Sequence, residues 1–226
     1  MSFPPKVLVG EIDIPLEGGR VTLHGDLQIP RAAIGLVLFV HGSGSSRHST
    51  RNQRVAAALR GRRIGTLLFD LLTEDEALRD DMTAEYRFDV EWLAGRLRQV
   101  TAWAAEQRAA MDLPFGYFGA STGAAAALIA ATQEDVRAVV SRGGRPDLAL
   151  EALPLVRAAT LLVVGGDDQE VIRMNWLAYE RLIGVKRMEI VPDAGHLFEE
   201  PGKLNEVAQL AGEWFEEHLP GGEEAP

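Results

Sequence analysis

The sequence predicts an α/β domain built on a mostly parallel β-sheet. Short apolar runs alternate along the chain with segments of helix length, and this order of elements is typical of parallel α/β folds. Several runs are apolar throughout, as expected for strands that helices cover on both faces. No linker divides the 226 residues, so we expect a single domain over residues 1–226, with a frayed tail at 220–226.

Eight strands and their helices can be placed along the chain. Two alternating stretches, residues 6–16 and 19–30, predict an antiparallel pair that turns at Glu17-Gly18-Gly19. Apolar residues at three- and four-residue steps predict helices from Leu93 to Ala104 and from Leu204 to His218. The six further strands are expected at residues 35–40, 65–70, 115–120, 137–142, 160–166 and 186–192.

Composition narrows the classes of function. With no cysteine, the chain has no disulfide, thiol nucleophile or cysteine-bound zinc. A net charge of −10 argues against nucleic-acid partners, which require clustered Lys and Arg. No apolar run is long enough for a transmembrane helix, and the first residues lack the pattern of a signal peptide. We therefore expect a cytoplasmic protein that binds neither nucleic acid nor membrane.

Residues with catalytic chemistry directly follow several of the expected strands. The serine is Ser121, the carboxylates are Asp167 and Asp168, and the histidine is His196. The carboxyl ends of parallel strands share one edge of the sheet, where such folds bind ligands. A hydroxyl, a histidine and a carboxylate on that edge are the groups that acyl transfer requires.

The segment GASTG around Ser121 fits the pattern G-x-S-x-G of a nucleophile elbow, a tight strand-to-helix turn that exposes a serine. Its small residues let the helix pass close behind the serine. The motif alone also fits a plain turn that carries a serine. The strand before it, the helix after it and the chain order Ser, Asp, His favour Ser121 as nucleophile and His196 as its base.

The glycine-rich loop after residue 40 is the candidate oxyanion loop. The oxyanion of acyl transfer needs two aimed N–H groups, and we expect one from the backbone of Thr122, directly after the serine. The other is expected from Ser43, with Gly44 as the alternative. A phosphate cradle is a weaker interpretation of this loop, because no G-K-[ST] follows it.

Four segments carry a family resemblance: FVHGSGSS, GASTGAAAAL, LLVVGGDD and GHLFEEPG. On them the chain, from about Val7 to Leu219, resembles the α/β-hydrolases of the dienelactone hydrolase-like group. The resemblance implies an eight-stranded sheet without a large cap, no cofactor or metal, and a catalytic acid at Asp168 rather than Asp167. Dienelactone hydrolases proper have a cysteine nucleophile and an acidic residue where this chain has Gly42, so the chain departs from them at both places.

The leading hypothesis is a serine hydrolase that cleaves a small carboxylic ester or lactone through an acyl-enzyme on Ser121, His196 and Asp168. Acyl transfer, or an amide or thioester substrate, uses the same residues and stays open. A non-catalytic binding protein on this fold is a further alternative.

The sequence indicates the residues that line the substrate site less clearly than it indicates the catalytic residues. Positions that follow strand ends supply the candidates, and for the arginines the alternative is pairing with nearby acids such as Asp147. The acidic segment 71–89 also follows a strand and is expected to rim an open pocket. The candidate lining residues are Gly42, Gly44, Arg47, Arg142 and Arg145, with His41 and His48 beside the glycine-rich loop.

Overall fold

The antiparallel strand pair expected near the start of the chain is present in the computed structural model, which describes residues 8–107 and 109–220. β1 (Leu8–Leu16) pairs with β2 (Val21–Ile29), and a 3-10 turn at Glu17–Gly19 joins them. Both glycines of the turn have positive φ, 68° and 87°, a conformation that glycine adopts at little cost. The start of the first expected strand and nearly all of the expected tail at 220–226 lie outside the described residues.

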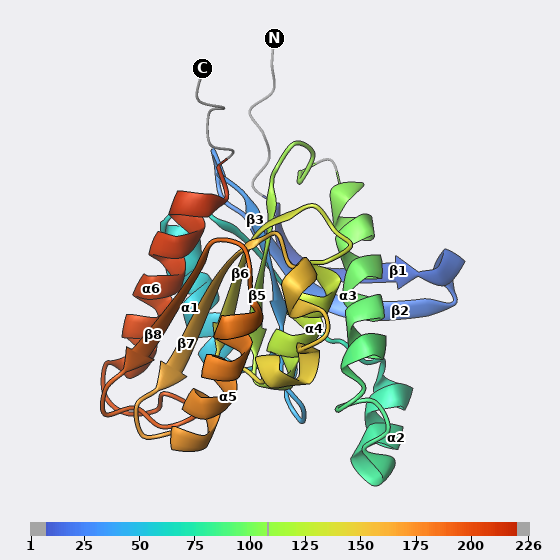
Figure 1. The fold of residues 1–226 in the computed structure, drawn as a ribbon. Helices are drawn as coiled ribbons and strands as arrows, with labels where there is room; N and C mark the ends of the chain where they lie inside the picture. The colour runs from blue at the N-terminus through green and yellow to red at the C-terminus, as the bar shows by residue number, and fades with distance from the viewer. Residues whose placement is uncertain (1–7, 108, 221–226) are drawn as a thin grey trace.

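Six further strands complete one sheet close to the predicted positions (Figure 1). The order is β1-β2-β4-β3-β5-β6-β7-β8, and only β1–β2 and β2–β4 pair antiparallel. The prediction of an eight-stranded, mostly parallel sheet is therefore confirmed. The six strands are β3 (Leu36–Val40), β4 (Gly65–Phe69), β5 (Phe115–Ala120), β6 (Val136–Arg142), β7 (Ala159–Gly165) and β8 (Lys186–Val191).

Helices cover both faces of the sheet, which explains the continuously apolar strands. Figure 1 shows α1 and α6 on one face, α3, α4 and α5 on the other, and α2 projecting at the carboxyl ends of the strands. Two clusters of buried apolar side chains result, one on each face. The helices are α1 (Thr50–Gly61), α2 (Glu74–Thr83), α3 (Val90–Ala105), α4 (Thr122–Ala130), α5 (Gln169–Arg181) and α6 (Lys203–His218).

Alternation along the strands decides which side chains reach which helix layer. On β5, Tyr117 packs in the cluster under α3 and α4, whereas its neighbour Phe118 packs in the cluster under α1 and α6. On β6, Ala138 and Val140 belong to the α1 and α6 cluster. Their strand neighbour two residues further on, Arg142, faces the same layer at the carboxyl edge.

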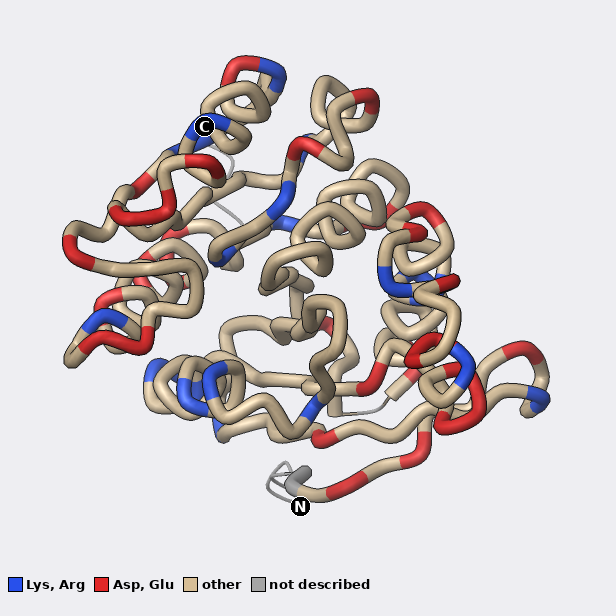
Figure 2. Tube along the Cα trace, turned by 90° about the horizontal axis from the view of Figure 1, so that it is seen from below, with Lys and Arg blue, Asp and Glu red and all other residues tan. Residues whose placement is uncertain are grey.

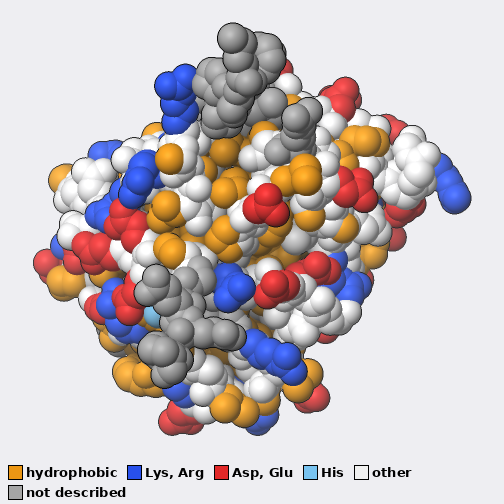
Figure 3. All heavy atoms as spheres, turned by 90° about the horizontal axis from the view of Figure 1, so that it is seen from above, with side chains coloured by type: hydrophobic (Ala, Val, Ile, Leu, Met, Phe, Trp, Pro, Cys, Tyr) orange, Lys and Arg blue, Asp and Glu red, His pale blue; other side chains and the backbone are white. Residues whose placement is uncertain are grey.

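Charge is mixed over both ends of the strands. Figure 2 looks onto the carboxyl edge and shows Lys, Arg, Asp and Glu interspersed around the rim, with a mostly uncharged middle. Figure 3 looks onto the opposite side, where charges of both signs lie among apolar atoms. Within the described part of the chain, no helix combines the length and the apolar character needed to cross a bilayer.

Candidate active site

Ser121 occupies the turn between β5 and α4 in a conformation that few residues adopt. Its φ is 50° and its ψ is −125°, and its side chain does not cap the helix that follows. A Cβ on Gly119 would lie 2.4 Å from the Cα of Ala124, and one on Gly123 would lie 2.3 Å from the Val40 carbonyl oxygen. The glycines of GASTG are therefore required by the close approach of α4, and the turn holds the serine hydroxyl away from the helix.

His196 and Asp168 are in direct contact on the same edge of the sheet. His196 follows β8, and its Nδ1 lies 2.7 Å from Oδ2 of Asp168. Asp168 follows β7 and caps the first turn of α5, where its other oxygen accepts the Val171 N–H. The structure thus brings Asp168 to the histidine, and among the described residues the side chain of Asp167 makes no hydrogen bond to His196.

A short segment of β6 lies between the serine and the histidine. The Ser121 N–H donates to the Arg142 carbonyl at 3.3 Å. A Cβ on the next residue, Gly143, would lie 2.9 Å from the His196 carbonyl oxygen and 3.6 Å from its Cε1. Within the described residues, no hydrogen bond joins the Ser121 and His196 side chains. Such bonds are often long in unliganded enzymes and form in the substrate complex.

The glycine-rich loop lies directly against the elbow. A Cβ on Gly42 would lie 2.9 Å from the Ser121 Cβ and 3.0 Å from the Ala120 carbonyl oxygen, so a larger side chain at Gly42 requires the loop to shift. The Ser43 N–H donates to the Thr122 hydroxyl at 3.0 Å. This contact differs from the expected picture of Ser43 as a free donor, because the hydroxyl of Thr122 reaches across to it. For the Ser43 N–H to bind an oxyanion, that hydroxyl must rotate away.

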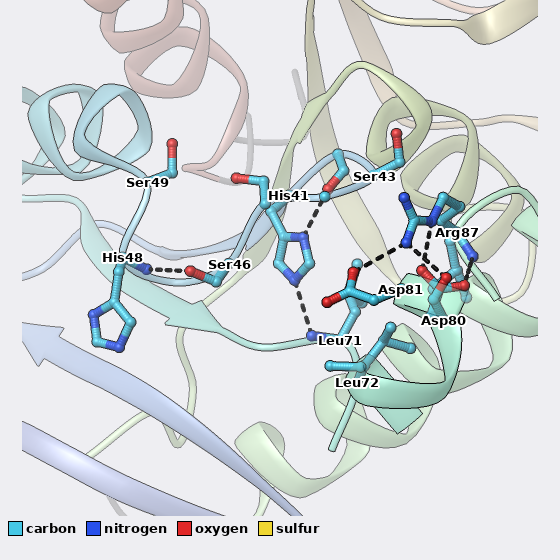
Figure 4. Close-up of a pocket in the computed structure, with 15 residues that line it drawn as sticks. His41, Ser43, Ser46, His48, Ser49, Leu71, Leu72, Asp80, Asp81 and Arg87 are labelled. Carbon is cyan, nitrogen blue, oxygen red and sulfur yellow. Dashed lines mark hydrogen bonds and ion pairs between the residues drawn. The ribbon is translucent and has the colours of Figure 1, made fainter. Parts of the chain in front are cut away.

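His41 holds the base of this loop, a role that the sequence reasoning missed. The ring is buried; its Nε2 accepts the Leu71 N–H at 3.1 Å, so its Nδ1 carries the proton and donates to the Gly42 carbonyl at 3.0 Å (Figure 4). Burial lowers the pKa of His41 and outweighs the raising effects of the Gly42 carbonyl and of Asp70. A neutral ring therefore fixes the Gly42–Ser43 peptide. The only sequence signal was a histidine directly before the first glycine of the loop.

A cavity of about 420 Å³ opens between the loop and the segment after β4. Residues of the segment 71–89, which is expected to rim the pocket, form one wall of this cavity, but Ser121, Asp168 and His196 are not among its lining residues. Arg87 contributes a cation there, but its Nε lies 2.7 Å from Asp80 and a terminal nitrogen lies 3.2 Å from Asp81 (Figure 4). The lining residues are His41–Ser46, His48, Ser49, Leu71, Leu72, Ala77, Asp80, Asp81, Arg87 and Leu93.

The candidate arginines at or after strand ends divide into two kinds. Arg47 pairs with Asp70, and Arg145 makes two bonds of 2.9 and 2.8 Å to Asp147, as the alternative of local pairing predicts. Arg142 is buried and has no acidic partner among the described residues. No three His, Asp or Glu side chains in this described part of the chain lie so that they could share a metal ion.

Comparison with solved structures identifies the family of this site. A dienelactone hydrolase from Anabaena variabilis ATCC 29413 is 52% identical in sequence, and the match covers 96% of this chain and 100% of that one, with a TM-score of 0.90. This chain belongs to the dienelactone hydrolase family. It has the α/β-hydrolase fold, as predicted, although no family model matches it. This member of the dienelactone hydrolase family therefore has a glycine at position 42 (Gly42) and a serine at the proposed nucleophile position (Ser121).

More distant structures share the fold alone. Est1E from Butyrivibrio proteoclasticus is 14% identical and has a TM-score of 0.75, and the match covers 92% of this chain and 98% of that one. An esterase domain of a Rhodothermus marinus protein is 17% identical with a TM-score of 0.73, and the match covers 94% and 100% of the two chains.

Curated relatives in Mycobacterium tuberculosis are longer proteins. "Putative phosphoribosyl transferase Rv0571c" of strain H37Rv is 52% identical over 212 residues, which make up 92% of this chain and 47% of that protein. The corresponding protein of strain CDC 1551, MT0597, matches to the same extent. This chain thus spans about half the length of these relatives.

Proposed function

We propose that this chain is a serine hydrolase that cleaves a carboxylic ester or lactone through an acyl-enzyme. The observation that carries the proposal is the backbone of Ser121, a non-glycine residue held at a φ of 50° beside the strand ends that supply His196 and Asp168. Strain of this kind persists only where surrounding structure enforces it, and it gathers at active sites. The fold and the family support a hydrolase, and the three side chains supply the chemistry.

The reaction follows from the positions of these groups. Nε2 of His196 takes the Ser121 proton as the serine oxygen attacks the ester carbonyl, while the Asp168 carboxylate holds the proton on Nδ1. The oxyanion that forms is stabilised by the Thr122 N–H at the start of α4, and by the Ser43 N–H once the Thr122 hydroxyl turns aside. His196 then gives its proton to the leaving alcohol oxygen.

Water completes the cycle. It attacks the acyl carbonyl, its proton passes to His196, and the returning pair of electrons releases the Ser121 oxygen, which takes that proton back. The products are the carboxylic acid and the alcohol, or a hydroxy acid if the substrate is a lactone. Amides, thioesters and acyl transfer would use the same acyl-enzyme, and competing alcohols or amines in the assay distinguish them by their products.

The cavity beside the loop indicates the kind of group that the substrate carries. Its wall combines serine hydroxyls with the apolar side chains of Leu71, Leu72 and Leu93. The Arg87 cation on that wall is already paired with two carboxylates. We infer that this cavity takes an uncharged acyl or alcohol group of small to medium size.

Phosphoribosyl transfer is not proposed for this chain. The relatives that carry that name are matched over less than half their length. The dienelactone hydrolase is equally identical and is matched over its full length. The part of those relatives that corresponds to this chain is therefore proposed to be a hydrolase unit.

A serine-directed fluorophosphonate probe and a panel of p-nitrophenyl esters test the proposal. The probe should label the wild type and not Ser121→Ala, and Ser121→Ala should lower kcat/KM by about a thousandfold or more. Asp168→Asn should cost about as much, whereas the matched control Asp167→Asn should keep its activity within about threefold. Labelling that persists in Ser121→Ala, or equal losses in the two aspartate variants, would refute the proposed roles.

A further inference from the structure

Asn175 is a fully buried polar side chain on the inner face of α5. Its Nδ2 donates to the Gly144 carbonyl at 3.0 Å and to the carbonyl of Val171, four residues back along the helix, at 2.8 Å. The amide nitrogen has two hydrogens, so each of them is directed at one carbonyl oxygen. The opposite orientation of the amide would place its oxygen against two acceptors, so these contacts decide the orientation.

The fold buries this amide at a cost. Among the described residues, the Oδ1 of Asn175 has no hydrogen-bond partner. A buried acceptor without a partner destabilises the folded state, and an apolar side chain of the same shape would avoid that penalty. The other buried residues of α5, Val171 and Ala178, are apolar. A polar residue that packing alone does not explain is expected where a functional site requires it.

The Gly144 carbonyl belongs to a peptide group that also binds the nucleophile. The same peptide carries the Arg145 N–H, which donates to the Ser121 carbonyl at 3.0 Å. At the other end of this short segment, the Arg142 carbonyl accepts the Ser121 N–H at 3.3 Å. A Cβ on Gly144 would lie 2.6 Å from the Ala124 Cβ, so the segment also packs directly on the start of α4. Residues 142–145 therefore hold the strained backbone of the serine from both sides.

On its other side the Asn175 amide is connected to the proposed catalytic acid. Val171, whose carbonyl accepts from Asn175, donates its own N–H to Oδ1 of Asp168 at 3.4 Å. The second oxygen of Asp168 lies 2.7 Å from Nδ1 of His196. Bonded contacts therefore run without interruption from the backbone of the serine, through this amide, to the acid and its histidine.

This connection joins parts of the site that different strands carry. Ser121 follows β5, whereas Asp168 and His196 follow β7 and β8, and β6 lies between the two groups in the sheet. Acyl transfer depends on the alignment of these groups, and a misplacement of about 1 Å can lower the rate about a hundredfold. A contact that ties α5 to the end of β6 fixes this alignment from inside the fold.

We propose that Asn175 is a positioning residue, whose amide fixes the Ser121 backbone relative to the pair of Asp168 and His196. The role rests on the proposed hydrolase function. Asn175 acts through the Gly144–Arg145 peptide and takes no part in the proton transfers.

Asn175→Leu tests this role, because it removes the amide and nearly keeps the shape of the side chain. For a p-nitrophenyl ester, kcat should fall about tenfold or more and KM should stay within about twofold, since alignment rather than substrate binding is lost. The rate at which a fluorophosphonate labels Ser121 should fall in the same proportion. Both are measured well below the unfolding temperature of each variant, so that only folded protein is compared.

Thr101→Val is the matched control. Thr101 is buried on α3, and its hydroxyl donates to the carbonyl of Leu97, four residues back, and bonds the Tyr117 hydroxyl on β5. The control thus also removes a buried polar group that joins a helix to the sheet, but at a distance from the 142–145 segment. Its kcat should stay within about twofold of the wild type. Equal losses of kcat in Thr101→Val and Asn175→Leu would overturn the proposal.

Asn175→Ser keeps the test decisive if the leucine variant does not fold. A serine hydroxyl can still donate to the Val171 carbonyl of its own helix turn, but its side chain is one bond shorter and does not reach Gly144. Its kcat should fall as it does in Asn175→Leu. Full kcat in the folded serine variant would show that the bond to Gly144 is not required.

Hydrogen exchange tests the connection apart from turnover. The Arg145 amide, which donates to Ser121, should exchange about tenfold faster in Asn175→Leu than in the wild type or in Thr101→Val. Unchanged exchange overturns the connection, and faster exchange with an unchanged kcat overturns the positioning role. A wild type that neither cleaves esters nor takes the probe refutes the hydrolase function itself, and that failure is seen before any substitution is made.

Discussion

Two arginines of this molecule are almost equally buried and have opposite surroundings. Arg96 on α3 is 5% exposed; its two terminal nitrogens lie 3.1 and 2.8 Å from the Glu76 carboxylate, and its guanidinium lies 4.5 Å from the centre of the Trp92 ring. Arg142 on β6 is 6% exposed and has no such partner among the described residues. Arg96 finds its counter-ion inside the fold, and Arg142 does not.

The difference separates charges that hold the structure together from a buried charge that has no counter-ion among the described residues. Around α2 the buried Arg96 and the partly buried Arg87 are both paired, since Arg87 binds Asp80 just as Arg96 binds Glu76. These pairs attach α2, which forms a wall of the cavity, to the rest of the molecule. At the end of β6 the fold buries a charge without that compensation, next to the residues proposed to perform the reaction.

The largest expected effect comes from replacing each arginine by an apolar residue of similar length. Arg96→Met leaves the Glu76 carboxylate without its partner and should lower the free energy of unfolding by about 3 kcal/mol. Arg142→Met removes a buried unpaired charge and should leave stability unchanged or raise it by about 1 kcal/mol. Urea unfolding in a buffer without phosphate or carboxylates measures both. Equal losses in the two variants would show that Arg142 is also paired in solution.

A smaller effect is expected from acid. Burial raises the pKa of Glu76, but the hydrogen bonds from Arg96 and Thr73 outweigh it, so the pKa lies below its ordinary value of 4.5. A lowered pKa in the folded state means that this stabilisation is full above pH 4.5 and is lost as the pH falls through the folded-state pKa. Glu76→Gln should therefore flatten the fall of stability below that pH.

The same unfolding measurement at several pH values checks this prediction. Glu74→Gln is the matched control, because Glu74 lies on the same helix turn and makes no ion pair among the described residues. If Glu76→Gln and Glu74→Gln change the acid slope alike, the pair with Arg96 is not what stabilises the folded state.

The smallest effect concerns the start of α2. Thr73 caps this helix; its hydroxyl accepts the Glu76 N–H at 3.2 Å, and its own N–H donates to the Glu76 carboxylate at 2.8 Å. Thr73→Ala should cost about 1 kcal/mol and speed amide exchange in the first turn of α2. Thr83→Ala, at the other end of the helix, should leave that turn unchanged. An unchanged exchange rate in Thr73→Ala would mean that the ion pair to Arg96 alone holds the helix.

Much of the fold could be predicted because its signals are local. Continuous apolar runs identify strands covered on both faces, and glycines mark the turn after β1 and the elbow around Ser121. The meeting of Asp168 with His196 was also predictable, because both follow parallel strands and so reach the same edge. The family pattern chose between Asp167 and Asp168, which strand counting alone could not do.

The contacts that the sequence did not reveal depend on side chains far apart along the chain. The Thr122 hydroxyl that takes the Ser43 N–H is 79 positions away, and the Leu71 N–H that fixes the His41 tautomer is 30 positions away. Whether an arginine is paired is likewise decided by the tertiary structure. Arg47, Arg142 and Arg145 all lie at or after strand ends, and only their packing shows that one of them lacks a carboxylate.

The order of the strands has a consequence for how this site could diverge. From β3 the chain moves outward to β4 and then returns past β3 to β5, so the direction of winding reverses between β3 and β5. The helix after β3 therefore lies on one face and the helix after β5 on the other (Figure 1), and the two loops that lead to these helices lie in contact at the carboxyl ends of adjacent strands. Insertions in either loop can reshape what binds there while the sheet that aligns Ser121 stays the same.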